Sequence, residues 1–246
     1  MKIKNTITGS LAAFAVFASQ ASAEIVLTDD LSLSGYIDIW LDSLDSEDDA
    51  DYGVQEIELA FAFTPADSPW SAVAELSLDG ADAFSGGEEI TLNTETVTVT
   101  YAASDALSFT IGNILSYQGF ETFDATGLYQ YSYSGTGGSV LYSAEYAFGA
   151  SADYATDDYS LGFWIGDNGG EASTEYLFAY TGIENTTLKV IFADDPGYES
   201  LNVWGSYDYG DFTFAFEFYD NDPTAGSSSK EVESSMGLVY YSIGDA

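Results

Sequence analysis

Hydrophobic and polar residues alternate with a period of two along most of the chain, and helical periodicity is almost absent. The clearest case is the segment 212–218, which has Phe at every second position. Such alternation puts apolar side chains on one face of a β-strand and polar side chains on the other. About twelve strands are predicted from the alternation and from the turn residues between them. They cover residues 31–42, 53–63, 70–79, 92–102, 107–114, 139–155, 159–166, 173–181, 186–193, 199–208, 211–219 and 232–243.

The connections between these strands fall into two sets. The short set comprises 64–69, 103–106, 156–158, 182–185 and 209–210. The longer and more polar set comprises 43–52, 80–91, 115–138, 167–172, 194–198 and 220–231. Short turns on one side and long loops on the other are typical of outer-membrane barrels. We therefore predict an all-β fold, an up-and-down antiparallel transmembrane β-barrel.

Alternation alone does not say which face is buried, because a soluble β-sandwich turns its apolar residues inward and a membrane barrel turns them outward. Aromatic residues near predicted strand ends favour the barrel, since such residues form girdles at membrane interfaces. Examples are Trp40, Tyr101, Tyr154, Tyr159 and Tyr207. The alternative explanation is that aromatic residues simply favour strands.

The first 23 residues have the pattern of a secretory signal peptide. Lys2 and Lys4 precede a short apolar run, 11–17, and Ala21-Ser22-Ala23 matches a cleavage site. We expect the barrel domain to occupy 24–246. No other stretch is apolar for long enough to form a transmembrane helix.

The chain is very acidic, and this limits its partners. It has 41 acidic residues, no Arg and no His, and loss of Lys2 and Lys4 would take the net charge from −37 to −39. Such a surface repels nucleic acid and attracts cations. Without His or Cys, the common nucleophilic triads and zinc sites are excluded. A glycosidase-type carboxylate pair remains open, but no pair stands out among so many acids, and we expect a protein that is not an enzyme.

The polar face of the predicted strands carries the candidate site. In a barrel these residues line the lumen, where carboxylates favour the passage of cations. The predicted pore-lining residues are Asp38, Glu56, Glu58, Glu75, Glu145, Asp153, Glu175, Lys189 and Glu217. The alternative is that these acids are only solvated surface groups of an acidic chain.

The longest connection, 115–138, is rich in aromatic residues that need shelter from water. We predict that it folds into the lumen and narrows the pore; packing on the barrel mouth is the alternative. The predicted constriction residues are Tyr117, Phe120, Glu121, Phe123 and Asp124.

The run 42–51 contains six carboxylates, but it lacks the EF-hand spacing. A solvated loop with at most weak Ca²⁺ binding is the better interpretation, and no other cofactor or metal is expected.

Three segments resemble a known family. They are Leu33-Ser-Gly-Tyr-Ile-Asp38, the stretch 109–124 (FTIGNILSYQGFETFD), and 148–154 (FGASADY) with 161–168 (LGFWIGDN). They are similar to the OmpL-like outer-membrane β-barrel porins. The resemblance covers about residues 31–195, implies channel activity in the outer membrane, and supplies no catalytic residues.

The last residues, Tyr241-Ser-Ile-Gly-Asp-Ala246, lack the terminal aromatic residue that is usual in such barrels. Either the sequence is truncated or about twelve strands close with an atypical end. We predict a porin-like channel, located in the bacterial outer membrane and in contact with its lipid, that passes small hydrophilic solutes and favours cations. Two alternatives stay open: a secreted β-sandwich that binds carbohydrate or Ca²⁺, and a structural or adhesive barrel that does not conduct. The solute, the pore diameter and the oligomeric state do not follow from the sequence.

Overall fold

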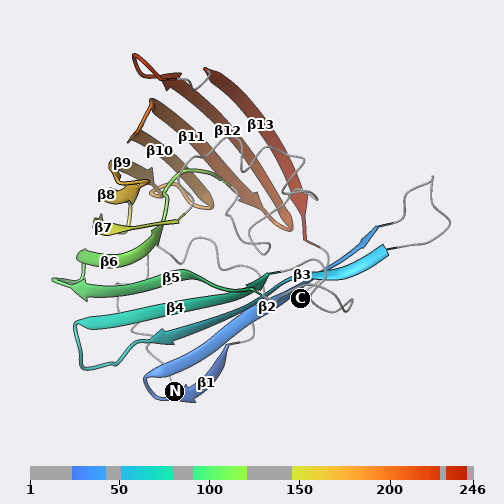
Figure 1. The fold of residues 1–246 in the computed structure, drawn as a ribbon, viewed down its shortest axis with the longest axis vertical. Helices are drawn as coiled ribbons and strands as arrows, with labels where there is room; N and C mark the ends of the chain where they lie inside the picture. The colour runs from blue at the N-terminus through green and yellow to red at the C-terminus, as the bar shows by residue number, and fades with distance from the viewer. Residues whose placement is uncertain (1–23, 43–50, 80–90, 121–145, 228–230, 243–246) are drawn as a thin grey trace. The chain divides into compact units, whose positions relative to one another are not determined.

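The computed structural model describes residues 24–42, 51–79, 91–120, 146–227 and 231–242. These residues form thirteen β-strands, in which each strand pairs with its neighbours in the sequence (Figure 1). Every pairing that the register specifies is antiparallel, from β1 with β2 to β12 with β13. No helix capable of crossing a bilayer occurs within these ranges. The predicted all-β, up-and-down antiparallel fold is therefore confirmed.

The first six strands are β1 (Ile25–Thr28), β2 (Leu31–Asp42), β3 (Asp51–Phe63), β4 (Trp70–Asp79), β5 (Thr91–Ala102) and β6 (Leu107–Leu115). The next seven are β7 (Tyr146–Ala155), β8 (Tyr159–Asn168), β9 (Glu171–Tyr180), β10 (Thr186–Asp195), β11 (Tyr198–Tyr209), β12 (Phe212–Pro223) and β13 (Val232–Tyr241). Each of the twelve predicted strands has a counterpart, whereas residues 139–145 of the predicted strand 139–155 and residue 243 of the strand 232–243 lie outside the described residues. The short strand β1 is an addition, because four residues are too few to show a period.

Strands β2 to β13 have nine to thirteen residues each, which is about the length that a tilted strand needs to cross a bilayer.

Two connections are much shorter than predicted. The expected loop 167–172 is a two-residue turn at Gly169 and Gly170, and both residues have positive φ, 67° and 93°. A hairpin turn with positive φ at both central residues matches the twist of the strands, and glycine adopts it without steric penalty. The expected loop 194–198 is likewise a turn at Pro196 and Gly197, where φ of Gly197 is 100°. The predicted sorting of loops by length therefore fails in this part of the chain.

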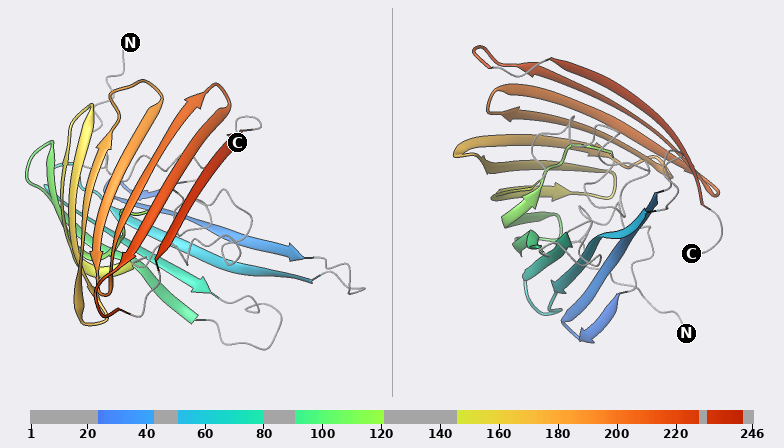
Figure 2. Two further views of the ribbon diagram at one scale, coloured as in Figure 1. Left: turned by 90° about the horizontal axis from the view of Figure 1, so that it is seen from above. Right: turned by 45° about the vertical axis from the view of Figure 1, so that its right-hand side comes forward.

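The chain divides into two compact units, one containing the described residues up to Val99 and the other those from Thr100. In the second unit, strands β7 to β13 run side by side in both views of Figure 2. The division neither confirms nor contradicts the predicted domain boundary at residue 24.

In the second unit most large apolar residues of the strands lie on the exposed face. Strand β12 shows this most clearly, since Phe212, Phe214 and Phe216 are 41%, 42% and 49% exposed. The residues between and beyond them, such as Glu217 and Tyr219, are buried. Strands β8 and β10 also expose apolar side chains at every second position, although their buried positions include Trp164 and Ile191. A soluble protein has the opposite arrangement, because exposed apolar area is unfavourable in water.

The first unit has the same arrangement. On β3, Leu59 is exposed and Glu58 is buried; on β4, Ser77 is fully buried. On β5, Val97 and Val99 are exposed, and Thr96 and Thr98 are buried. In each unit, the buried face with the polar side chains is called the inner face. The exposed, apolar face is called the outer face.

Aromatic residues gather on the outer face near the short turns. Tyr101, Tyr154, Tyr159 and Tyr207 are each at least 38% exposed, as an interfacial girdle requires. Tyr154 and Tyr159 flank one turn with ring centroids 6.3 Å apart. The side chain of Trp40 lies outside the described residues.

Candidate functional site

The inner face of the second unit brings together acidic side chains from separate strands. Alternation along β7, β9 and β12 turns Asp153, Glu175 and Glu217 to this face. Glu175 is fully buried, and Glu217 is 7% exposed. Buried carboxylates need hydrogen-bond donors, and here a single segment of the chain supplies many of them.

That segment is 116–120, which leaves the end of β6 and lies against the inner face of β7 to β12 (Figure 1). It is named the inner segment here. Its sequence is Ser-Tyr-Gln-Gly-Phe, and Gln118, Gly119 and Phe120 are buried. A path across the face of a sheet leaves backbone N–H groups without a ladder partner, so side chains must accept their hydrogen bonds.

Glu175 on β9 accepts three of the hydrogen bonds that hold the inner segment. The hydroxyl of Ser116 and the amide N–H of Tyr117 donate to its two carboxylate oxygens, each over 2.6 Å. The side-chain amide of Gln118 donates to Oε1 over 3.2 Å. Among the described residues, no other side chain accepts as many hydrogen bonds from these three residues, so Glu175 is the main anchor of the first half of the segment.

The second half of the inner segment is held by β11 and β12. The amide N–H of Gly119 donates to Oδ1 of Asn202 over 3.0 Å, and that of Phe120 donates to Oε1 of Glu217 over 3.1 Å. Asn202 also donates to Oε1 of Glu217 over 2.6 Å. The hydroxyl of Ser200 donates to Oε1 of Gln118 over 2.9 Å. Backbone amides along the segment are therefore paired with fixed side chains of the wall.

The side chain of Tyr117 adds a contact with β7. Its hydroxyl donates to Oδ1 of Asp153 over 2.5 Å, and the hydroxyl of Ser151 donates to Oδ2 over 2.7 Å. Burial raises the pKa of the Tyr117 hydroxyl, and the negative charge of Asp153 raises it further. The hydroxyl therefore stays protonated at neutral pH and remains a donor.

Apolar packing supports the same segment. The ring of Phe120 meets the ring of Trp204 edge-on with centroids 5.3 Å apart, and both pack with Ile191 and Ala215. Nζ of Lys189 lies 4.8 Å from the centroid of Trp204, which is within range of a cation–π interaction. The inner face thus has a dry, aromatic patch beneath the inner segment beside its polar positions.

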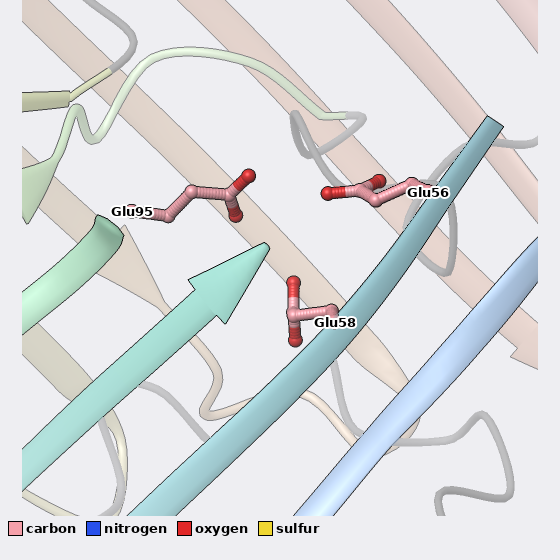
Figure 3. Close-up of side chains that lie close together, drawn as sticks. All are labelled: Glu56, Glu58 and Glu95. Carbon is pink, nitrogen blue, oxygen red and sulfur yellow. The ribbon is translucent and has the colours of Figure 1, made fainter. Parts of the chain in front are cut away.

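The inner face of the first unit carries a separate acidic cluster, formed by Glu56 and Glu58 on β3 and Glu95 on β5. Figure 3 shows the three side chains pointing toward one another. One carboxylate oxygen from each lies within 4.8 Å of the others. Glu58 is buried, whereas Glu56 and Glu95 are partly buried. These three residues are called the glutamate cluster.

The predicted pore-lining residues can now be placed. Those on the inner face are Glu56, Glu58, Glu75, Asp153, Glu175, Lys189 and Glu217. Glu145 and the side chain of Asp38 lie outside the described residues. Of the predicted constriction residues, Tyr117 and Phe120 lie in the inner segment, whereas Glu121, Phe123 and Asp124 lie outside the described residues. The same holds for 43–50 of the acidic run.

Several residues of the site were not predicted from the sequence. Gln118 and Asn202 were not predicted because a single amide side chain forms no sequence pattern that indicates a site. Trp204 occupies a polar-phase position on β11, and a large apolar residue at such a position is a signal that something covers it. Glu95 escaped because the alternation changes phase between Glu95 and Thr96, which both turn inward. A one-residue shift moves a side chain to the other face.

No protein-family model matches the chain, and no curated protein matches it. Among solved structures, a triple mutant of the Rhodopseudomonas blastica porin is similar at 17% identity and a TM-score of 0.42, with 84% of this chain and 94% of that chain covered. Another mutant of the Rh. blastica porin is similar at 18% identity and a TM-score of 0.41, with 80% of this chain and 86% of that chain covered. A structure concerned with the asymmetric conductivity of engineered proteins is similar at 19% identity and a TM-score of 0.41, with 80% of this chain and 86% of that chain covered. At TM-scores this low, function has to be inferred from the chain itself.

Proposed function

We propose that the chain is a porin-like channel of the bacterial outer membrane that passes small hydrophilic solutes and favours cations. The observation that carries the proposal is the orientation of the strands. Most large apolar side chains occupy the exposed outer face. Carboxylates, amides and hydroxyls occupy the inner face together with a smaller set of buried apolar residues, among them Trp164, Ile191 and Trp204. Lipid hydrocarbon is the environment that makes such an outer face favourable.

A strand in lipid must have all its backbone groups paired, so the proposal requires a sheet without open edges in the membrane. Exported barrels of this kind reside in the outer membrane, and a signal peptide at 1–23 would direct the chain there. The enclosed face then meets water, and passive diffusion through it needs no catalytic group.

Cation preference is supported by the charges of the inner face. Among the inner-face residues that the structure describes, at least eight carboxylates accompany one lysine, Lys189, since Glu95 and Asp195 add to the six that were predicted. In a narrow pore with low-dielectric walls, fixed charges of one sign concentrate the opposite ion.

The inner segment supports a constricted pore. Because 116–120 lies on the inner face rather than beyond the strand ends, it would occupy part of the lumen of a closed barrel. Its anchors on β7, β9, β11 and β12 are fixed by the sheet, so the constriction would be rigid.

Planar-bilayer recording tests the proposal. The refolded chain, added to a bilayer, is expected to give discrete conductance steps, and a KCl gradient is expected to give a reversal potential of the sign for cations. Stable insertion without conductance steps would refute a channel and favour the structural barrel. Recovery of the folded chain as a detergent-independent soluble protein would refute the membrane location.

Selectivity is tested by replacing Glu56, Glu58 and Glu75 together with Gln. The reversal potential is expected to move toward zero, because three inner-face charges are removed. Glu184→Gln is the control, since Glu184 is exposed in a turn. An unchanged reversal potential in the triple variant would show that these carboxylates do not line the ion path.

A further inference from the structure

The glutamate cluster concentrates acidic side chains in a unit whose sequence has no basic residue. Glu56, Glu58 and Glu95 bring three carboxylates within 4.8 Å of one another, and residues 21–99 contain no Lys, Arg or His. Like charges at this distance repel strongly where burial lowers the dielectric. A compensating positive charge from solution would remove that repulsion.

A second observation points to the same place. Ser77 on β4 pairs directly with Glu58 on β3, so the two side chains are neighbours on the inner face. Ser77 is fully buried, and within the described part of the chain its hydroxyl has no hydrogen-bond partner. Buried hydroxyls are almost always satisfied, because an unsatisfied one costs about 1–3 kcal/mol. Its oxygen is available as a ligand beside the cluster.

We propose that Glu56, Glu58 and Glu95, with the hydroxyl of Ser77, form a binding site for one Ca²⁺ ion. Hard oxygen ligands of this kind suit Ca²⁺ and Mg²⁺ but not softer metals. Two ligands on opposite sides of an ion are separated by twice the metal–oxygen distance, about 4.6–5.2 Å for Ca²⁺ and about 4.0–4.2 Å for Mg²⁺. The three carboxylate oxygens all lie within 4.8 Å of one another, so they can converge on one ion, and the larger Ca²⁺ requires less approach of the ligands than Mg²⁺ does.

Tyr36 on β2 fixes one of the ligands. Its hydroxyl donates to Oε2 of Glu56 over 2.8 Å and so restrains the position of that carboxylate. Hydrogen bonds of this type orient metal ligands and are part of many metal sites. Waters would complete the six to eight oxygens that Ca²⁺ takes.

Isothermal titration of the full refolded chain in detergent with CaCl₂ tests the site. Salt of about 0.15 M screens exposed carboxylates, so diffuse binding to the acidic surface is weakened. We expect one Ca²⁺ site per chain that MgCl₂ does not fill at the same concentration. Glu58→Gln and Glu95→Gln are each expected to weaken it about tenfold or more, because ligand charge sets Ca²⁺ affinity.

The matched control is Asp67→Asn, which removes one exposed charge from a turn of the same unit and is expected to leave the Ca²⁺ site unchanged. Ser77→Ala is expected to weaken it less than the glutamate variants do. If Glu58→Gln fails to fold, Glu95→Gln decides, since Glu95 is only partly buried. Wild-type affinity in the folded glutamate variants would overturn the site, and equal affinity for Mg²⁺ would overturn its assignment to Ca²⁺.

This site goes beyond the proposed channel and does not depend on it, because all four residues belong to one compact unit. Ca²⁺ binding is measured without conduction, and conductance steps are measured without Ca²⁺. The two proposals can therefore fail separately.

Discussion

Replacement of Glu175 by Gln tests how the inner segment is held. Glu175 is fully buried and accepts hydrogen bonds from the Ser116 hydroxyl, the Tyr117 amide N–H and the Gln118 side chain. Gln has almost the same shape, so it leaves the packing intact. It replaces one acceptor oxygen with an NH₂ group, which cannot accept the hydrogen bond of an N–H donor.

The magnitude follows from these contacts. A hydrogen bond to a charged group contributes about 1.5–3 kcal/mol and a neutral one about 0.5–1.5 kcal/mol. Loss of one bond and weakening of two others removes about 4 kcal/mol. When the inner segment docks, it covers the side chain at position 175 and removes water from it. This dehydration costs a neutral amide less than a carboxylate, and the difference offsets about 2 kcal/mol of the loss. The net loss of about 2 kcal/mol is roughly a thirtyfold shift toward the undocked segment.

Amide hydrogen exchange measured by mass spectrometry reports this equilibrium directly. The amides of Tyr117, Gly119 and Phe120 are protected only while they donate to the wall. In Glu175→Gln we expect exchange in the peptide containing them to be roughly thirtyfold faster. Exchange in strands β10 to β12 is expected to stay at the wild-type rate.

The control for this experiment is Glu171→Gln, because Glu171 lies on the same strand, β9, and is exposed. It removes the same charge without touching the inner segment, so wild-type exchange is expected. Wild-type exchange in Glu175→Gln as well, or equal acceleration in both variants, would refute the conclusion that Glu175 anchors the segment.

Two further predictions concern pH and close packing. The raised pKa of Tyr117 means that the docked segment binds this proton more tightly than the undocked one. The contribution of this hydroxyl to docking is therefore constant below the ordinary tyrosine value of 10.0 and weakens as pH rises above it. Exchange is expected to accelerate at alkaline pH beyond the intrinsic rate in wild type but not in Tyr117→Phe, and equal profiles would contradict this. Gly149→Ala would place a Cβ 2.0 Å from the carbonyl oxygen of Ile165, so we expect a loss of about 1–3 kcal/mol in thermal unfolding. Gly237→Ala, whose Cβ meets no atom within 4 Å, is the control, and equal unfolding temperatures would contradict the prediction.

The positions of the strands could be predicted because a two-residue period is a local property of the sequence. The run of Phe at 212–218 needs no distant partner to show which residues share a face. The same alternation placed Glu175 and Glu217 on the polar face before any pairing was known. The order of residues along each strand therefore determines which side chains share the inner face and that many of them are acidic.

What covers that face was decided by the tertiary structure. Residues 116–120 carry no period, and the donors of the segment meet Glu175, Asn202 and Glu217 only because three strands distant in sequence lie within its reach. The prediction that the loop turns inward came from the need of its aromatic residues for shelter, not from knowledge of their partners.

The glutamate cluster shows the same division. Glu56 and Glu58 were placed on the polar face from the sequence, but their approach to Glu95 depends on a change of phase in β5 and on the register of β3 and β4. The turns at 169–170 and 196–197 were also misjudged, because polar residues beside glycine can extend a strand as well as form a loop. Local stereochemistry determines which face of a strand a side chain occupies. Contacts between residues on different strands depend on long-range pairing, which no single segment encodes.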